Sequence, residues 1–283
     1  MSRVTDFAET VTRTRATDFT ETEAAICVLA NMIEDDKVCW AVAGGPGRIA
    51  TLLTQRLYAS NLTVVLEEGT MGPQPILPHD PMMNHNSMKA SYRSVAWTNM
   101  NTVCSHASLG LFDYGVLATL QVDPYGNINS SLLGGDYYHP GRRYGGAGGA
   151  NEIASLCWRT LLITRQEKKK FVKKMDFITS PGFLDGSPGA REKAGLPVGS
   201  GPYRVVTPEA VFGFDEKTRY MKLLAIAQWV KVEDVLGKME FEPMMATKIE
   251  RLEPPTEEEL GVLRAFIDPG GERIGAGKWI HIE

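Results

Sequence analysis

The chain has 283 residues, of which 43% are hydrophobic and 23% charged, and its formal net charge is −4. This is the composition of an ordinary globular protein, and its acidic balance offers nothing that would attract nucleic acid or an anionic membrane. The four cysteines show no Cys-x-x-Cys spacing, and no stretch has the apolar length of a membrane span or of a signal peptide. We therefore expect a cytoplasmic protein with reduced thiols.

The first part of the chain predicts an arm and then a capped helix. Residues 1–19 carry mixed charge and little periodicity, so we interpret them as a loosely held arm. Residues 20–283 show neither a repeat nor a linker and predict a single domain. Thr20 and Glu23 have the spacing of a capping box, which predicts a helix that ends near Asp35.

A strand–helix–strand unit follows. Residues 38–43 predict a strand, 44–47 a tight Gly-Gly-Pro-Gly turn, 48–58 an amphipathic helix and 62–66 a second strand. The crossover of such a unit is right-handed and its strands are parallel, so their carboxyl ends lie at one edge of the sheet.

That edge is the first candidate site. In open α/β sheets, ligands bind in the crevice beyond the carboxyl ends of the strands. Glu67 and Glu68 end the second predicted strand, and Gly44 and Gly45 follow the first. Position makes either acid a catalytic candidate, and Glu68, Gly44 and Gly45 are candidates for lining the pocket. A surface acid at the start of a loop is the alternative interpretation.

The remaining elements complete an open α/β domain. We expect a mostly parallel central sheet flanked by helices, with a short strand meander and a helix toward the C-terminus. A long loop over residues 72–101, rich in Pro, Met, Asn and His, is expected to wall the crevice. The further predicted strands cover 114–122, a short stretch that follows a turn at 123–127 and ends at 131, and residues 160–164 and 176–180. The predicted meander covers 203–207, 210–214 and 220–224. The further predicted helices cover 151–156, 232–237 and 256–266, and residues 181–202 form a loop.

Two loops and a basic run could also bind a ligand. The glycine-rich residues 145–150 open a predicted helix, where backbone N–H groups can approach an anion, although a tight packing turn explains such a run equally well. His139 lies in a polar and aromatic turn that could face the crevice. The basic run 165–174 is most simply a solvated face, with phosphate binding as the alternative. No spacing predicts a metal site or a serine-hydrolase elbow.

Four stretches, in this order, resemble the β subunits of family I CoA-transferases. They are Glu67-x-Gly69 after the buried strand, residues 121–130 (Gln-Val-Asp-Pro-Tyr-Gly-Asn-Ile-Asn-Ser), Gly146-x-Gly148-Gly149-Ala150-Asn151, and residues 179–186 (Thr-Ser-Pro-Gly-Phe-Leu-Asp-Gly). The resemblance runs from about residue 22 to the final turn. It implies an α/β fold with a mostly parallel sheet and a homologous α subunit as partner.

The resemblance also implies the roles of individual residues. The nucleophilic glutamate of the family falls on Glu67, with Gly69 third in its motif, and the glycine-rich motif falls on Gly146, Gly148, Gly149 and Ala150. The implied activity moves CoA from an acyl-CoA to a carboxylic or dicarboxylic acid through a glutamyl-CoA thioester. CoA is then a substrate, and no tightly bound cofactor is expected. We expect residues 146–150 to donate to the oxyanions of the reaction.

One residue departs from the family pattern. Where the motif has a small Ser or Asn, this chain has Glu68. A second acid in the same pocket would oppose ionisation of Glu67. Strand alternation predicts instead that the two side chains point to opposite faces. The departure keeps open a CoA-ester decarboxylase or hydrolase on the same scaffold, and a metabolite-sensing domain without catalysis is a third hypothesis.

Overall fold

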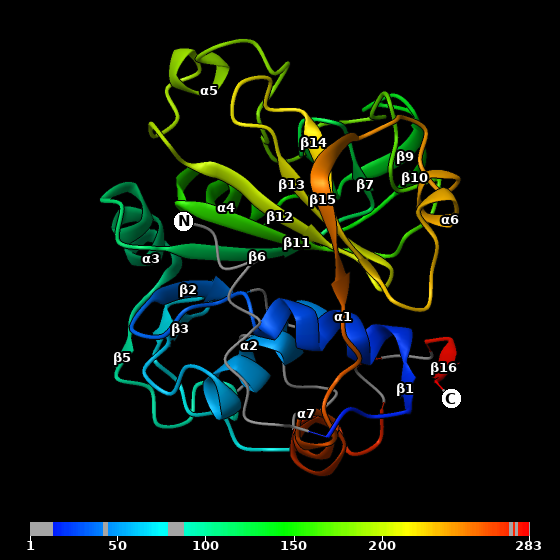
Figure 1. Ribbon diagram of the computed structural model, residues 1–283. Helices are drawn as coiled ribbons and strands as arrows, with labels where there is room; N and C mark the ends of the chain where they lie inside the picture. Colours follow the sequence, from blue (N-terminus) through cyan, green and yellow to red (C-terminus); the bar gives the residue numbers. More distant parts are fainter. Residues whose placement is uncertain (1–13, 42–44, 79–87, 272–273, 275–276, 283) are drawn as a thin grey trace.

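The computed structural model describes residues 14–41, 45–78, 88–271, 274 and 277–282. Its centre is a ten-stranded sheet in the order β15-β14-β13-β12-β11-β6-β2-β3-β4-β5 (Figure 1). The strands are β2 (Val38–Ala41), β3 (Thr63–Val65), β4 (Thr70–Met71), β5 (Ala96–Trp97), β6 (Tyr114–Ala118), β11 (Arg159–Ile163), β12 (Gly201–Val206), β13 (Ala210–Phe214), β14 (Met221–Ala227) and β15 (Met244–Leu252).

The middle of the sheet is parallel. Strands β3, β2, β6, β11 and β12 run in one direction, with Val38 in register with Thr63. Antiparallel pairs extend the sheet on both sides, through β13 and β14 at one end and β4 and β5 at the other, and β15 pairs in parallel with β14. The predicted fold class, an open α/β domain with a mostly parallel central sheet, is confirmed.

Helices cover both faces of the sheet and leave two apolar cores. Val64 and Leu66 belong to the core shared with α1 and α2, whereas Val65 belongs to the core on the other face, with residues of α3 and α4. Figure 1 shows α1, α2 and α7 gathered on one side. The helices are α1 (Glu21–Ala30), α2 (Gly45–Leu57), α3 (Met100–Ser108), α4 (Ala150–Leu156), α5 (Ala190–Lys193), α6 (Val232–Leu236) and α7 (Glu257–Val262), which continues as the π-helical turn η1 (Leu263–Ile267).

Among the described residues, three small two-stranded sheets lie outside the central one. β1 (Asp18–Thr20) pairs with β16 (Trp279–His281), β7 (Gln121–Val122) with β8 (Ile128–Asn129), and β9 (Leu132–Gly135) with β10 (Pro140–Arg143). The first of these ties together two segments that lie far apart in the sequence. The last residues of the predicted arm pack against the domain, since Ala16 and Phe19 are buried.

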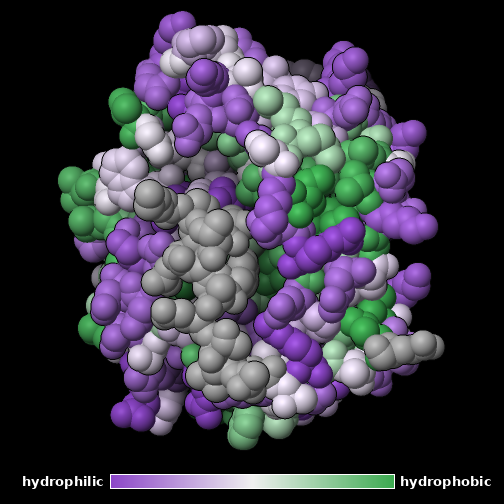
Figure 2. All heavy atoms as spheres, in the orientation of Figure 1, coloured by the Kyte–Doolittle hydropathy of each residue, from purple (hydrophilic) through white to green (hydrophobic). Residues whose placement is uncertain are grey.

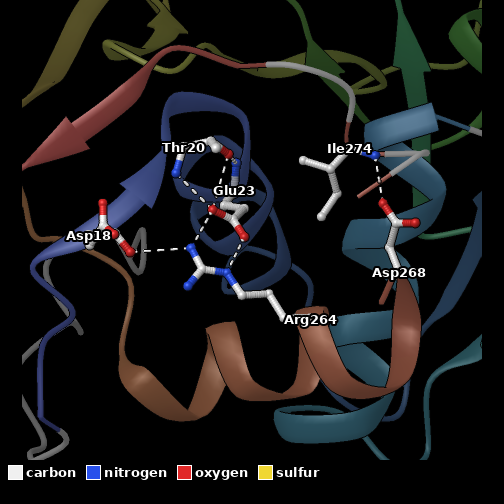
Figure 3. Close-up of polar contacts among 6 residues, drawn as sticks. All are labelled: Asp18, Thr20, Glu23, Arg264, Asp268 and Ile274. Carbon is white, nitrogen blue, oxygen red and sulfur yellow. Dashed lines mark hydrogen bonds and ion pairs between the residues drawn. The ribbon is translucent and has the colours of Figure 1, made fainter. Parts of the chain in front are cut away.

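The amino end of α1 is held by the predicted capping box and by a distant arginine (Figure 3). The Thr20 hydroxyl accepts from the backbone N–H of Glu23, and the Glu23 carboxylate accepts from the Thr20 N–H at 2.7 Å. Arg264 of η1 donates to both carboxylate oxygens of Glu23, at 2.7 and 2.9 Å. Burial alone would raise the pKa of Glu23, but Arg264 and Thr20 outweigh it and the pKa is lowered.

Several predicted boundaries are wrong. α1 ends at Ala30 and not near Asp35, because Asn31 caps it and Asp36 takes a left-handed conformation with φ 55°. Residues 45–47 form the first turn of α2 instead of a separate turn. Pro46 is tolerated there because the first N–H groups of a helix have no intrahelical acceptor.

Other predicted elements differ in kind. Residues 176–180 form no strand, and only Ser180 makes a bridge, to Ile128. The predicted meander, by contrast, is confirmed: β12, β13 and β14 pair antiparallel in chain order, and β12 joins them to the central sheet by pairing in parallel with β11. The chain also forms α3, β9, β10 and β15, which sequence patterning does not predict. None of the helices in the described ranges is both long and apolar enough to cross a membrane.

Candidate active site

A tight turn joins β3 to β4 and presents two acids at the carboxyl edge of the parallel strands. The N–H of Gly69 donates to the Leu66 carbonyl at 3.1 Å, so Glu67 and Glu68 are the central residues of the turn. Gly69 has φ +118°, and a Cβ there would lie 2.4 Å from the backbone nitrogen of Asn99. Thr98 fastens the turn through two hydrogen bonds to the Gly69 carbonyl. Glycine is therefore required at position 69 by its conformation and by this close approach.

The Glu67 carboxylate lies against the glycine-rich loop. The backbone N–H of Gly149 donates to Oε1 of Glu67 at 2.8 Å. A Cβ on Gly149 would lie 3.0 Å from Cδ of Glu67, and one on Gly148 would lie 3.3 Å from Oε1. The loop can approach the carboxylate this closely because these two residues have no side chain. The structure thus brings Glu67, Gly148 and Gly149 together from distant parts of the chain.

Gly146 and Ala150 take different places in the same loop. The N–H of Gly146 donates to the Ser130 carbonyl at 3.2 Å, and its carbonyl accepts from the Ser130 hydroxyl at 3.0 Å. A Cβ on Gly146 would meet nothing within 4 Å, although its φ of +85° favours glycine. Ala150 is the first residue of α4 and donates to the Ala147 carbonyl. These two residues shape the loop, and Gly149 is the one whose N–H reaches Glu67.

Two of the other family motifs form the support of this loop. The Asp123 carboxylate accepts from the N–H groups of Tyr125 and Asn127, and the Asn127 side chain accepts from the N–H groups of Gly182 and Leu184. Residues 121–130 and 179–186 are thereby locked together. The backbone N–H of Ser130 also donates to the Thr179 hydroxyl at 2.9 Å. Ser130 therefore connects the locked motifs to the glycine-rich loop.

Glu68 points to the other face of the sheet. Glu67 meets α4, whereas the carboxylate of Glu68 acts electrostatically on Arg48 of α2, which is only 1% exposed. This agrees with the prediction from strand alternation. Both carboxylate oxygens of Glu68 are buried and have no hydrogen-bond partner among the described residues, and the same is true of Nη2 of Arg48.

Cys104 and Glu152 share the electrostatic environment of Glu67, and sequence reasoning missed them. Burial raises the pKa of the Cys104 thiol, and the charges of Glu152 and Glu67 raise it further, which places all three groups in one electrostatic environment. Oε2 of Glu152 is buried, with no hydrogen-bond partner in the described part of the chain. The only signal in the sequence was the position of Glu152 just after the glycine run. Cys104 lies on α3, which the sequence pattern did not predict.

The remaining predicted site residues lie elsewhere or outside the described ranges. Gly45 begins α2, and Gly44 falls outside the described residues. His139 lies at the exposed tip of the β9–β10 hairpin, with Nδ1 3.6 Å from a carboxylate oxygen of Asp136. Within the described ranges no group of three His, Cys, Asp or Glu side chains is arranged to hold a metal ion.

A large cavity in the described part of the chain lies away from Glu67. It measures about 750 Å³ and is lined by residues that include Trp158, Arg191, Gly201 and Arg219. Trp158 and Gly201 lie at the amino ends of β11 and β12, at the edge of the sheet opposite to Glu67. Chemistry and position favour the Glu67 turn over this cavity as the candidate active site, because ligands of open α/β sheets bind at the carboxyl ends of the strands.

Comparison with known protein families defines the class of protein. The family model described as Coenzyme A transferase matches residues 22–238, and the chain belongs to this family. The resemblance inferred from the four motifs is confirmed, as is the prediction of an enzyme of the CoA-transferase class.

Particular relatives are similar over nearly the whole chain. The β subunit of glutaconate CoA-transferase from Acidaminococcus fermentans is 34% identical over 90% of this chain and 94% of its own. The crystal structure of that glutaconate CoA-transferase superposes with a TM-score of 0.84, at 32% identity, over 92% of this chain and 99% of the other. The β subunit of 3-oxoadipate CoA-transferase from Pseudomonas knackmussii is 29% identical over 88% and 93% of the two chains. The decarboxylase AibA/AibB, at 21% identity and a TM-score of 0.73 over 90% and 97%, shares the fold.

Proposed function

We propose that this chain is the catalytic β subunit of a heteromeric CoA-transferase, which moves CoA from an acyl-CoA to a carboxylic or dicarboxylic acid through a glutamyl-CoA thioester on Glu67. The observation that carries the proposal is the position of the Glu67 carboxylate. It is half-buried, it lies beyond the carboxyl ends of parallel strands, and it accepts one hydrogen bond from the backbone of Gly149. The named relatives are subunits of enzymes that transfer CoA.

The reaction consists of addition and elimination steps at carbonyl carbons. A carboxylate oxygen of Glu67 attacks the thioester carbonyl of the acyl-CoA, and the CoA thiolate leaves, which gives a mixed anhydride. The thiolate then attacks the glutamyl carbonyl and releases the first acid as its carboxylate. The acceptor carboxylate attacks the resulting glutamyl-CoA thioester, and the same steps in reverse yield the new acyl-CoA and restore Glu67.

The glycine-rich loop stabilises the charge that develops at Glu67. When the glutamyl carbonyl becomes tetrahedral, its oxygen carries negative charge at the place where Gly149 already donates. Removal of one such donor typically costs about 3 kcal/mol of transition-state stabilisation. In this proposal Gly146, Gly148 and Ala150 keep the loop in its conformation, and Gly69 keeps the turn.

A homologous α subunit completes the enzyme in this proposal. Large apolar side chains are exposed on β5 and α3 and around them, close to the turn that Thr98 fastens, and exposed apolar patches mark interaction surfaces. They are Tyr92, Val95, Trp97, Met100, Leu109 and Leu111. Figure 2 shows a second apolar region on the upper right of the molecule, where β14 and β15 lie in Figure 1. The relatives are each named as one subunit of a larger enzyme, which supports an α subunit as the occupant.

The names of the two relatives also indicate the class of substrate. The relatives act on glutaconate and 3-oxoadipate, so we expect the acceptor to be a dicarboxylic acid. CoA itself is a substrate and a product. We place the enzyme in the cytoplasm, where CoA esters are metabolised.

Isolation of the covalent intermediate tests the proposal. The complex of both subunits is incubated with acetyl-CoA or succinyl-CoA without an acceptor, and its peptides are analysed by mass spectrometry. We expect CoA on the peptide that contains Glu67 and none after Glu67→Gln. Glu233→Gln, which changes an exposed acid of α6, is the matched control. Turnover without an adduct, together with an active Glu67→Gln variant, would contradict the proposal.

A decarboxylase or hydrolase is the second candidate, because the fold is shared with the decarboxylase AibA/AibB. Release of carbon dioxide or of the free acid from an acyl-CoA in the absence of an acceptor would favour it. Binding of acyl-CoA without any turnover by the complex would favour a metabolite-sensing domain instead.

A further inference from the structure

The carboxylate of Glu68 is an unusual group to find beneath an active-site turn. Both of its oxygens are buried, and no described residue donates a hydrogen bond to either. An ionised carboxylate in such a place destabilises the fold unless an opposite charge offsets it. The family motif has a small Ser or Asn at this position, so the group belongs to this chain and is not required by the motif.

Arg48 supplies the opposite charge from the same face of the sheet. It lies in the first turns of α2, which packs on the core that contains Val64 and Leu66. Its Nη1 donates to the Thr51 hydroxyl at 3.4 Å, and its Nη2 has no hydrogen-bond partner among the described residues. Burial lowers the pKa of Arg48 to about 10, while the Cys39 thiol and the Glu68 carboxylate oppose that lowering. The guanidinium therefore stays charged at neutral pH.

The two residues act at a common edge. Arg48 follows β2 and Glu68 follows β3, and these strands are parallel neighbours with Trp40 in register with Val65. Val64 and Leu66 belong to the core that α2 covers and Val65 to the other core. Continued alternation directs Glu67 toward α4, where Gly149 donates to it, and Glu68 toward α2. An attraction between the two charges would draw Glu68 inward and leave Glu67 facing Gly149.

We propose that Arg48 and Glu68 form a buried charge pair that sets the conformation of the β3–β4 turn, which makes Glu68 a positioning residue for Glu67. The inference rests on the proposed function of Glu67. Because Arg48 neutralises the charge of Glu68, the second acid does not hinder ionisation of the nucleophile. Loss of one partner leaves a buried charge uncompensated, and the turn then rearranges so that one side chain reaches solvent.

A double-mutant cycle tests the pair. The rate of CoA adduct formation on Glu67 is measured in single turnovers of the whole αβ complex, with acetyl-CoA or succinyl-CoA and no acceptor, for E68Q, R48M and R48M/E68Q. A misplacement of about 1 Å lowers such a rate by about 100-fold. We expect losses of this order in both single variants, with KM unchanged. We expect the double variant to recover to within about 10-fold of the wild type, since neither charge then remains.

The outcomes separate the pair from simple stability and from the proposed function. Thermal unfolding of each variant shows whether it is folded, and Glu233→Gln is the control. Folded single variants that form the adduct at the wild-type rate would overturn the proposal, as would a double variant whose loss equals the product of the single losses. Should the single variants fail to fold, a folded and reactive double variant supports the pair and an unfolded one overturns it. A wild-type complex that forms no adduct contradicts the proposed function itself.

Discussion

Two buried carboxylates, Glu23 and Glu68, lie near arginines in different parts of the molecule and differ in what surrounds them. Glu23 accepts four hydrogen bonds, two from Thr20 and two from Arg264 (Figure 3). Glu68 accepts none from the described residues. A fully satisfied carboxylate stabilises the fold, whereas an unsatisfied buried one must be explained by something else, and function is the usual explanation. The difference separates the part of the chain that holds its ends together from the part that performs chemistry.

The largest expected effect is on activity and not on stability. Glu67→Gln removes the nucleophile and should lower CoA transfer by about 10⁴-fold or more. Because Glu67 is half-buried and makes one hydrogen bond, the free energy of unfolding of the protein should change by no more than about 0.5 kcal/mol in this variant. Steady-state kinetics and urea denaturation of the same preparation check both statements. A strongly destabilised variant would show that Glu67 resembles Glu23 after all.

A methyl group at the glycine loop should have the next largest effect. Gly149→Ala places a Cβ 3.0 Å from Cδ of Glu67, so we expect kcat to fall by about 100-fold through displacement of the carboxylate. Gly261→Ala in α7 is the matched control. A Cβ there meets nothing within 4 Å, and alanine should stabilise the helix by about 0.5–1 kcal/mol without a change in activity. Equal activity of the two variants would argue against a close approach of the loop to Glu67.

The satisfied carboxylate predicts the opposite pattern. Arg264→Met removes two charge-assisted hydrogen bonds to Glu23, and we expect a loss of about 2 kcal/mol in the free energy of unfolding, with Arg264 partly exposed to solvent. CoA transfer below the melting temperature should be unaffected. Urea denaturation measures the loss, and an unchanged midpoint would show that the pair contributes nothing.

The smallest expected effect is on the pH dependence of stability. The pKa of Glu23 is lowered in the folded state, so its contribution is present above its ordinary pKa of 4.5 and is lost as the pH falls through the folded value. The urea midpoint of the wild type should therefore decrease as the pH falls below about 4.5, and the midpoint of Arg264→Met should decrease less. A larger acid sensitivity in the variant than in the wild type would contradict the assignment.

Local patterns predicted much of the fold. The capping box of Thr20 and Glu23, the apolar periodicity of α2 and the β-branched run of β3 each depend on residues close together in the sequence, and each is confirmed. Elements with weak local patterns were missed. Met244–Leu252 becomes a strand only because β14 lies beside it, and residues 176–180 have a strand-like composition but no partner along their length among the described residues.

The candidate site divides in the same way. The sequence by itself determined that Glu67 follows a buried strand, that Glu68 alternates with it, and that glycines open a helix near residue 150, because these are statements about neighbouring residues. Only the tertiary structure decided that Gly149 donates to Glu67, that the charges of Glu67 and Glu152 act on Cys104, and that the charge of Glu68 acts on Arg48. These contacts join segments that are brought together by strand order and by packing on the two faces of one sheet. Neither the strand order nor the packing can be predicted from a local stretch of the sequence.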